Sequence, residues 1–475
     1  MKIHISGLGV IPELQVFLKP LTVFVGENGT GKTWTAYSIA ALFGEYGFKR
    51  YVNAYLQGRT AFRYPPVERT VKDLIEKGSA TLNIVEFAKE HTETYINEIA
   101  KLAPNWLNEF MATRRVDFGN VTIRAELSEA AKQALSGKLK ERRIELERFV
   151  GAKSESSELE FNCLKERGLD ELYFYTTYAK NGSGAIPRPV VDKTLREFVV
   201  ISIFYTIRSE LFHDLVMLPT ERTTVITIPF PHDEPEFGET PRTEEATEPR
   251  RSGPVWSLSK PVLNLRKMVE ACTSQYAARK EEEARDPRLI EMMKLGRFLE
   301  QEILFGSISA ERDGNLTELL YSPAEKVSLE LNVSSSLVKE LTPLALYLKC
   351  LAKPGDLIVI DEPEMNLHPA AQVEITEFLG MLVNAGLHVL ITTHSPYIVD
   401  HIPNLIRAHD LDKEKVKEYF YLKQETSFLP RDKVAVYLFE TDSVTDILKE
   451  DGDIDWGTFG DVSRDLSRIS SRLIA

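Results

Sequence analysis

One short segment combines three glycines with a lysine and a threonine in an order that suits phosphate binding. Glycines let backbone N–H groups turn inward around a phosphate, and the Lys32 ammonium neutralises the outer phosphate oxygens. The Thr33 hydroxyl is a ligand for Mg²⁺ in such loops. We therefore expect a magnesium-bound nucleoside triphosphate here, and the next residue, Trp34, either stacks on its base or packs within the helix that follows. The segment fulfils the pattern GxxxxGK[ST] and runs Gly26-Glu27-Asn28-Gly29-Thr30-Gly31-Lys32-Thr33.

A second set of chemically active residues lies far along the chain. Asp361 and Glu362 directly follow the apolar run 357–360. A carboxylate at the carboxyl end of a parallel strand faces the crevice where ligands bind, so Asp361 is a candidate Mg²⁺ ligand, directly or through water. Glu362 can orient or deprotonate an attacking water as a general base. His394 ends another apolar run and can donate a hydrogen bond to a γ-phosphate.

These residues meet only if a parallel sheet brings its strand ends together. Buried apolar runs that alternate with helical stretches predict such a sheet, and hence an α/β fold with helices on its faces. Helical spacing of apolar positions, with dense charge between them, predicts further helical insertions at 72–111 and 263–304. The strand-like runs are 21–25, 356–360 and 387–393, and the helical stretches between them include 32–42 and 371–383. The run 434–439 reads as an edge or closing strand.

The composition of the 475 residues is that of a globular protein, with 43% hydrophobic and 27% charged residues. This excludes a chain that is mostly disordered or membrane-embedded. The chain contains neither an apolar run long enough to span a membrane nor a signal-peptide core, so we expect a cytoplasmic protein without a membrane partner. The three cysteines are too far apart for a disulfide framework or a CxxC pair and are expected to pack as small apolar residues: Cys163, Cys272 and Cys350.

The formal net charge of −13 disfavours nucleic acid as a partner of the whole molecule. Contact with DNA would need a local basic patch, for which the stretch 138–143 is the best candidate. Acidic residues interrupt this stretch, which also suits a solvated helix face.

Together these motifs resemble the ABC-type ATPase superfamily. Within it they are similar to the stand-alone prokaryotic "AAA family" ATPases, which are related to the overcoming-lysogenization-defect nucleases and to the heads of SMC-like chromosome-maintenance ATPases. The stretch Ser334-Ser335-Ser336 opens a segment that looks like the family's signature, although it lacks the usual glycines. Residues 218–222 resemble the family's Pro-x-Glu-Arg segment. The stretches that carry the resemblance are GENGTGKT at 26–33, SSSLVKEL at 334–341, LIVIDEPEMNLHP at 357–369 and ITTHSP at 391–396.

The resemblance implies a P-loop NTPase of the ABC-head type that binds ATP and Mg²⁺ and hydrolyses ATP. Its site is composite: Ser334, Ser335 and Ser336 of one subunit complete the γ-phosphate shell around the triphosphate that the other subunit's Lys32 and Asp361 bind. ATP then holds a head-to-tail dimer or a larger homo-oligomer together, and hydrolysis releases it. Lys32, Glu362 and His394 are the implied catalytic residues.

The motif positions, the helical spacing and the composition suggest an arrangement of the chain into six parts. The phosphate loop and the carboxylates fall in separate lobes, with helical segments and an acidic, proline-rich loop between them. The parts are a first ATPase lobe (1–50), a helical insertion (51–115), the remainder of the first lobe with helices (116–230), the flexible acidic loop (231–255), a helical arm (256–325), and a lobe with the signature, the carboxylates, His394 and a closing segment (326–475).

Relatives of this kind commonly act beside a nuclease or a toxin. We therefore expect nucleotide-driven assembly that senses a signal and controls a separate effector protein, in prokaryotic anti-phage or toxin–antitoxin defence. The alternative is an ATP-gated DNA-binding or DNA-repair clamp of the SMC-like type. The spacing of Glu440 from Asp451 and Asp453 is too short for the βα unit of a Toprim nuclease, so nuclease chemistry is not expected within this chain.

Overall fold

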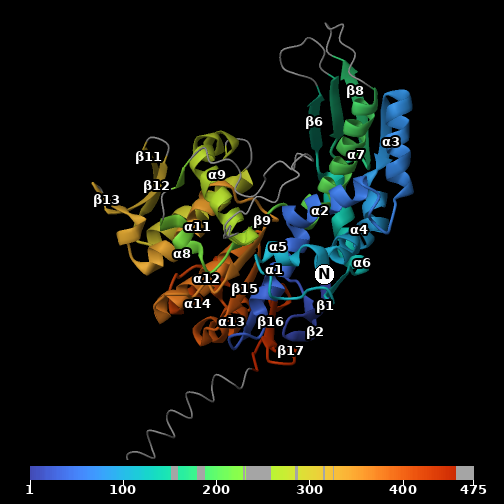
Figure 1. Ribbon diagram of the computed structural model, residues 1–475. Coiled ribbons are helices and arrows are strands. Elements are labelled where there is room, and N and C mark those ends of the chain that lie inside the picture. The colour runs from blue at the N-terminus through green and yellow to red at the C-terminus, as the bar shows by residue number, and fades with distance from the viewer. Residues whose placement is uncertain are drawn as a thin grey trace, which may run out of the picture.

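The computed structural model describes residues 1–150, 159–178, 188–227, 230–231, 258–283, 287–313, 316–324 and 326–455. Figure 1 shows a central sheet flanked by helices, an elongated arm that contains α3, α7, β6 and β8, and a second group of elements from α8 to β13. Most of the acidic loop predicted at 231–255 lies outside the described residues, as do residues after 455.

The central sheet has six strands in the order β17-β16-β3-β15-β14-β9. All of them run parallel except β17, which pairs antiparallel with β16 at the edge. Their continuous apolar runs are typical of strands that are buried on both faces. The strands are β3 Leu21–Gly26, β9 Leu215–Leu218, β14 Leu357–Asp361, β15 His388–Thr393, β16 Val434–Phe439 and β17 Val444–Asp446.

The register of the sheet brings the carboxyl ends of three strands together. Asp361 of β14 is opposite Thr392 of β15, and Thr393 is opposite Val25 of β3. The parallel sheet expected from the sequence is therefore confirmed. The run 434–439, expected as an edge or closing strand, is β16, which ends the parallel part of the sheet; it is not the edge itself, because the short antiparallel β17 pairs with its other side.

Alternate residues of the central strands enter two hydrophobic cores, one on each face of the sheet. On one face, Phe24, Val359 and Leu390 pack with helix α1 (Lys32–Phe43). On the other face, Val23 and Ile360 pack with the helices of the carboxyl-terminal lobe. These helices are α11 Ser336–Cys350, α12 Pro369–Asn384 and α13 Pro396–His409. Because both faces are covered, the strand ends are the places where polar residues reach solvent.

The elongated arm is a mixed α/β unit, and the stretch 51–115, expected as a helical insertion, contains helices and one short strand. Strand β4 interrupts the helices there and joins an antiparallel sheet of order β4-β8-β7-β6. Its helices are α2 Glu45–Leu56, α3 Pro65–Lys77, α4 Ile84–Lys101, α5 Leu107–Phe110, α6 Glu129–Glu141 and α7 Arg188–Leu211, with a 3₁₀ turn at Ala103–Asn105. Its strands are β4 Ser79–Asn83, β6 Ile144–Val150, β7 Leu159–Lys165 and β8 Glu171–Tyr178.

A small antiparallel sheet of order β2-β1-β5 lies beside α1. Its turn residues, Gly9 and Val10, contact the start of α1. The strands are β1 Lys2–Leu8, β2 Ile11–Phe17 and β5 Thr122–Glu126. This sheet supports the loop that precedes α1 from one side.

The second group of elements confirms the helices expected at 263–304 and adds strands that the sequence did not predict. Strands β11 and β12 form a hairpin, with β13 and β10 on its other edge. The helices are α8 Arg222–Thr227, α9 Lys260–Glu283, α10 Pro287–Phe298 and a π-helix at Leu299–Ile303. The strands are β10 Phe230–Pro231, β11 Ser307–Asp313, β12 Leu316–Ala324 and β13 Val327–Glu330, and a 3₁₀ turn, Leu331–Val333, leads into α11.

The remaining described elements after α13 are short. They are α14 Lys413–Val416 and 3₁₀ turns at Lys417–Tyr419, Glu425–Ser427 and Arg431–Lys433. Among the helices that the structure describes, none is both long and apolar enough to cross a membrane. All three cysteines are buried, and none of them forms a disulfide in the described part of the chain, which agrees with the expectation that they pack as small apolar residues.

His388, the first residue of β15, gives the fold a pH dependence that can be measured. Burial lowers the pKa of this imidazole from 6.5 to about 4, so the unfolded chain binds a proton that the folded chain does not. Stability is therefore present above the unfolded pKa and falls as the pH drops below it, by about 2 kcal/mol at pH 5. In chemical denaturation at several pH values, His388→Gln should remove this slope, whereas His409→Gln, at a partly exposed position, should keep it. An unchanged slope in His388→Gln would assign the loss to other groups.

Candidate active site

The segment between β3 and α1 forms a tight loop that only glycine can make at two positions. Gly26 and Gly31 have φ values of 149° and 92°. A Cβ atom on Gly26 would lie 2.1 Å from the Phe439 carbonyl oxygen, and one on Gly31 would lie 2.4 Å from Cδ1 of Ile11. No side chain caps the start of α1, so the N–H groups of its first turn are free to bind an anion.

Lys32 lies beneath this loop and is almost completely buried, with 5% of its surface exposed. Its Nζ donates hydrogen bonds to the carbonyl oxygens of Gly26, at 2.9 Å, and Glu27, at 2.7 Å. Burial lowers the pKa of Lys32 to about 8, although nearby carboxylates oppose this shift. The ammonium group of Lys32 therefore lies against the loop, where it can neutralise phosphate oxygens.

Thr33 and Asp361, the two expected magnesium ligands, are in direct contact. The Thr33 hydroxyl donates a hydrogen bond of 2.9 Å to Oδ1 of Asp361. Thr392 donates to the same oxygen, and the Tyr37 hydroxyl lies 3.3 Å from Oδ2. Burial raises the pKa of Asp361, and the hydrogen bonds from the two threonines oppose this. The motifs that are far apart in sequence thus form one site.

This arrangement fits magnesium rather than a metal held by protein ligands alone. Among the described residues, no group of three or more His, Cys, Asp or Glu side chains is placed to hold a metal ion. Magnesium is usually bound through one or two protein oxygens, together with phosphate oxygens and waters. The hydroxyl of Thr33 and the carboxylate of Asp361 match that donor set.

Glu362 and His394 form a pair beside the same strand ends. Nε2 of His394 lies 3.1 Å from Oε1 of Glu362. The hydrogen bond from His394 holds the pKa of Glu362 below its usual range. A carboxylate in this state can accept a proton from a water. The structure therefore brings together all five chemically active residues singled out from the motifs, namely Lys32, Thr33, Asp361, Glu362 and His394.

Sequence reasoning missed Tyr37 and Glu364. Tyr37 follows Thr33 by one helical turn, so its proximity to Asp361 could have been found from helical spacing. Glu364 accepts hydrogen bonds from the Thr393 hydroxyl, at 2.8 Å, and from the His394 backbone N–H, at 2.6 Å. Its other oxygen, Oε2, is buried without a hydrogen-bond partner in the described part of the chain, and burial raises the pKa of this carboxyl group. Glu364 thus fixes the backbone that carries His394.

Two substitutions of Glu364 distinguish the contribution of its hydrogen bonds from the contribution of its negative charge. In Glu364→Ala the His394 turn loses both hydrogen bonds, and we expect turnover of ATP to fall about 10-fold or more, since a lost buried hydrogen bond costs about 1–3 kcal/mol. Glu364→Gln keeps an oxygen acceptor and should remain close to wild type. Steady-state phosphate release gives kcat and KM for both variants. Equal losses in the two variants would show that the site needs the charge of Glu364.

The signature serines lie at the start of α11 and are bonded within their own chain. Ser335 is the N-cap, and its Oγ accepts from the Val338 N–H at 3.3 Å. Ser334 donates to the Leu331 carbonyl oxygen at 2.7 Å, and Ser336 donates to that of Asn366 at 2.9 Å. Among the described residues, no hydrogen bond joins these serines to the loop at 26–33. Their assignment as nucleotide contacts stays a prediction.

Trp34 is partly buried and packs against the hydrophobic core. Its ring meets that of Phe118 edge to face, with 5.7 Å between the centroids. A Cβ atom on Gly9 would lie 2.0 Å from the same ring, so the turn of the first hairpin also rests on it. These contacts match the packing role for Trp34 that the sequence left open. Among the described residues, no other aromatic side chain is identified as a stacking partner for the nucleotide base.

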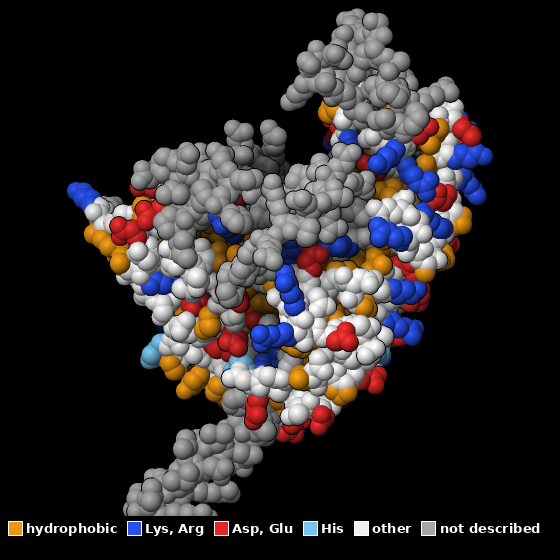
Figure 2. Space-filling view, viewed as in Figure 1, with side chains coloured by type: hydrophobic (Ala, Val, Ile, Leu, Met, Phe, Trp, Pro, Cys, Tyr) orange, Lys and Arg blue, Asp and Glu red, His pale blue; other side chains and the backbone are white. Residues whose placement is uncertain are grey.

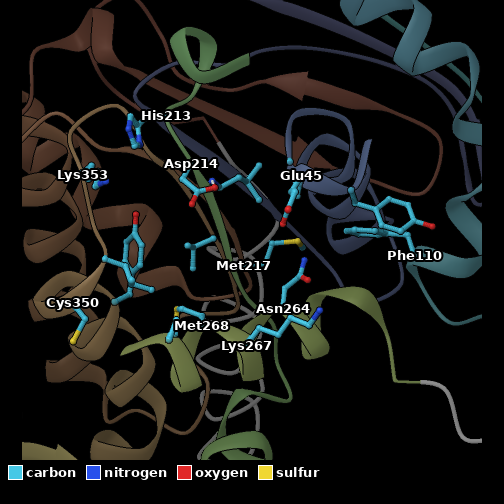
Figure 3. Close-up of a pocket in the computed structure, with 18 residues that line it drawn as sticks. Glu45, Phe110, His213, Asp214, Met217, Asn264, Lys267, Met268, Cys350 and Lys353 are labelled. Atoms are coloured by element: carbon cyan, nitrogen blue, oxygen red, sulfur yellow. Dashed lines mark hydrogen bonds between the residues drawn. The ribbon is translucent and has the colours of Figure 1, made fainter. Parts of the chain in front are cut away.

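A cavity of about 460 Å³ lies away from the phosphate loop, between the start of α2, strand β9 and helix α9. Figure 3 shows Glu45 and Asp214 on one side of it and Lys267 and Asn264 on another. No residue of the loop at 26–33 and neither Asp361 nor Glu362 lines it. We therefore do not assign the nucleotide to this cavity.

The basic stretch at 138–143 is paired with acidic groups. Arg142 forms an ion pair with Glu210, and Arg143 lies 3.0 Å from Glu145. On the face shown in Figure 2, lysine and arginine side chains along the arm are likewise interspersed with acidic ones. This pattern favours a solvated surface over a phosphate-binding patch.

Residues 328–400 match the protein family described as "AAA domain, putative AbiEii toxin, Type IV TA system". The matched stretch contains the signature serines, Asp361, Glu362 and His394. The chain carries an ABC-type AAA domain. The fold expected from the sequence, an α/β P-loop NTPase of ABC-head type, is thereby confirmed. This AAA domain contains the carboxylates of the site. The phosphate loop lies outside the matched residues, and the hydrogen bond between Thr33 and Asp361 joins the two parts.

Solved structures of SMC heads are similar to the chain over nearly its whole length, at 11% identity. They are an SMC head bound to the C-winged helix domain of ScpA (TM-score 0.35, covering 94% of this chain and 96% of that chain), the SMC head domain from Thermotoga maritima (0.29, 94% and 98%), and an SMC head with an extended coiled coil bound to the C-terminal domain of ScpA derived from Pyrococcus furiosus (0.34, 99% and 98%). The AAA domain is identified by its motifs and by the order of its strands. No curated protein matches the chain significantly.

Proposed function

We propose that this chain is a Mg²⁺-dependent ATPase whose nucleotide state controls its assembly. The observation that carries the proposal is the contact between Thr33 and Asp361, because it unites a phosphate loop with the carboxylates of a hydrolytic site. The AAA domain at 328–400 supports the same reading.

Each residue of the proposed site has its own role in hydrolysis. The loop N–H groups and Lys32 bind the phosphates, while Thr33 and Asp361 hold Mg²⁺, which when bound neutralises charge on the phosphate oxygens. Glu362 orients a water and accepts its proton. His394 holds Glu362 in place and can donate a hydrogen bond toward the phosphate. Each of these groups acts from the carboxyl edge of the parallel sheet.

Phosphate release by the purified chain tests this activity. We expect release from ATP that requires Mg²⁺ and stops when Lys32 is replaced by alanine. Release that is equal in wild type and Lys32→Ala would come from a contaminant and would contradict the proposal.

The second part of the proposal is that two chains complete the site head to tail. The start of α11 offers the positive end of a helix dipole to a phosphate, and no intrachain hydrogen bond brings it to the loop in the described residues. Mixing two inactive variants tests this. Lys32→Ala supplies an intact signature and Ser335→Arg supplies an intact loop, so their mixture should regain activity through hybrid dimers. A mixture as inactive as its components would rule out the composite site.

We further propose that the assembled state acts on a separate effector, a nuclease or a toxin, in a defence or toxin–antitoxin module. The support is the toxin–antitoxin description of the matched family. Co-purification with the products of adjacent genes, with and without ATP, tests it. An ATP-dependent complex with such a product is expected, and salt-sensitive binding to DNA alone would instead favour a clamp.

A further inference from the structure

Arg222 is a buried arginine whose guanidinium faces the backbone of the site. Only 1% of its surface is exposed. Its Nη1 donates to the Asp361 carbonyl oxygen at 2.7 Å and to that of Pro219 at 3.1 Å, and its Nη2 donates to the Glu362 carbonyl oxygen at 2.8 Å. The planar guanidinium thus binds the backbone of both neighbouring acidic residues at once, through two different nitrogens.

The backbone that Arg222 binds is strained. Glu362 has a φ of 51°, in the left-handed region that non-glycine residues rarely adopt and that costs of order 1–3 kcal/mol. Its N–H donates to the Thr392 carbonyl oxygen at 3.0 Å, while Arg222 holds its carbonyl group. The backbone N–H and the carbonyl group of Glu362 are therefore both fixed by hydrogen bonds, and the side chain of Glu362 is directed to His394.

The charge of Arg222 is balanced by a residue of the signature helix. Nε of Arg222 lies 2.8 Å from Oε2 of Glu340, whose side chain is fully buried. The other oxygen of Glu340 accepts from the Thr223 hydroxyl at 2.8 Å and from the Asn366 amide at 2.9 Å. Asn366 in turn accepts from Ser336 through its carbonyl oxygen. The pair therefore links the turn after β14 to the start of α11.

We propose that Arg222 is a positioning residue that holds Glu362 in its left-handed conformation, and that Glu340 ties this conformation to the signature helix of the same chain. The inference rests on the proposed ATPase function. A displacement of α11 would move Glu340, release Arg222 and let Glu362 turn away from His394. The position of α11 is in this way linked to the conformation of the general base Glu362 in the same chain.

A double substitution separates this role from simple stabilisation. Arg222→Gln alone leaves the Glu340 carboxylate buried without its charge partner, so the variant should be destabilised. Arg222→Gln with Glu340→Gln removes both charges and should recover most of the stability. Glutamine is too short to serve both carbonyl groups, so turnover should stay about 100-fold below wild type, the loss expected when a reacting group is misplaced by about 1 Å. Affinity for ATP should change less than threefold.

The matched control is another buried ion pair that involves a residue of α11. Lys349 of α11 lies 2.7 Å from Glu300, and both side chains are less than a tenth exposed. The double variant Lys349→Met with Glu300→Gln should keep near-wild-type turnover once its melting temperature is matched. If the Arg222/Glu340 double variant regains turnover together with stability, the pair is only structural and the inference is overturned.

A spectroscopic measurement tests the inference without hydrolysis. In ¹H–¹³C spectra, the His394 ring signal, assigned by its loss in His394→Asn, should shift in the Arg222/Glu340 double variant toward its position in Glu362→Gln. An unshifted signal would overturn the inference. Absence of hydrolysis by the wild-type chain would contradict the proposed function instead and leave this spectral comparison valid.

Discussion

Replacement of Lys32 by alanine is expected to abolish binding of ATP. Lys32 is the cation that the structure places under the phosphate loop, with its ammonium group on two loop carbonyl oxygens. Without it, the negative charge of the triphosphate meets Asp361 and Glu362 uncompensated. We expect affinity to fall by at least about 100-fold, or about 2.7 kcal/mol. Calorimetric titration with Mg²⁺ and ATP measures this directly.

The matched control for this experiment is Lys49→Ala. Lys49 lies on α2 and is exposed, with an ion pair to Glu45 on the same helix. It should bind ATP like wild type. Circular dichroism should show the same helix content in both variants. Affinity in Lys32→Ala within threefold of wild type would contradict the position assigned to the triphosphate.

Replacement of Glu362 by glutamine is expected to trap the ATP-bound assembly. The amide has nearly the shape of the carboxylate and can still contact His394, but it cannot accept a proton from water. Loss of a general base slows turnover by about 10²–10⁴-fold, while ATP affinity should be kept. Light scattering after gel filtration should therefore show a larger species that persists in ATP.

The control here is Glu76→Gln, at an exposed position on α3 with 54% of its side-chain surface accessible. It should hydrolyse ATP and dissociate like wild type. If Glu362→Gln hydrolyses ATP at the wild-type rate, Glu362 is not the base. If it is inactive but remains a monomer in ATP, nucleotide binding and assembly are not coupled as we propose.

The sequence predicts the strands β3, β14, β15 and β16 of the central sheet because the signal there is local, but it does not predict β9 or β17. Runs such as 357–360 are apolar without interruption, and each ends in a residue that suits a strand end. Parallel strands require their carboxyl ends to lie at one edge, so the meeting of Thr33 with Asp361 follows from topology. The contact between Glu362 and His394 follows in the same way, because both residues leave neighbouring strands.

The sheet of the arm could not be predicted in this way. Its strands are short, and β4 is a five-residue interruption between two helices. Its partner β8 lies much later in the chain, so the pairing depends on contacts that no local pattern reveals. The alternation of exposed and buried residues in β4 is also too brief to compete with the helical spacing on either side.

The polar contacts that support the site could not be predicted from the sequence either. Arg222 was noticed only through the resemblance of its segment to a family motif, and Glu340 lies in a helix whose pattern gives no sign of a buried carboxylate. Their pairing depends on side chains from α8 and α11 that meet behind β14. Such buried pairs are set by tertiary packing, which single-sequence patterns do not report.

Titration of the wild-type chain with ATP, with and without Mg²⁺, tests the central claim most directly. The claim is that the loop at 26–33 and Asp361 form one pocket for a magnesium-bound triphosphate. We predict saturable binding of one ATP per chain that strengthens when Mg²⁺ is present and weakens when Asp361 is replaced by asparagine. Failure to bind ATP in the presence of Mg²⁺, by a chain shown to be folded, would contradict the account.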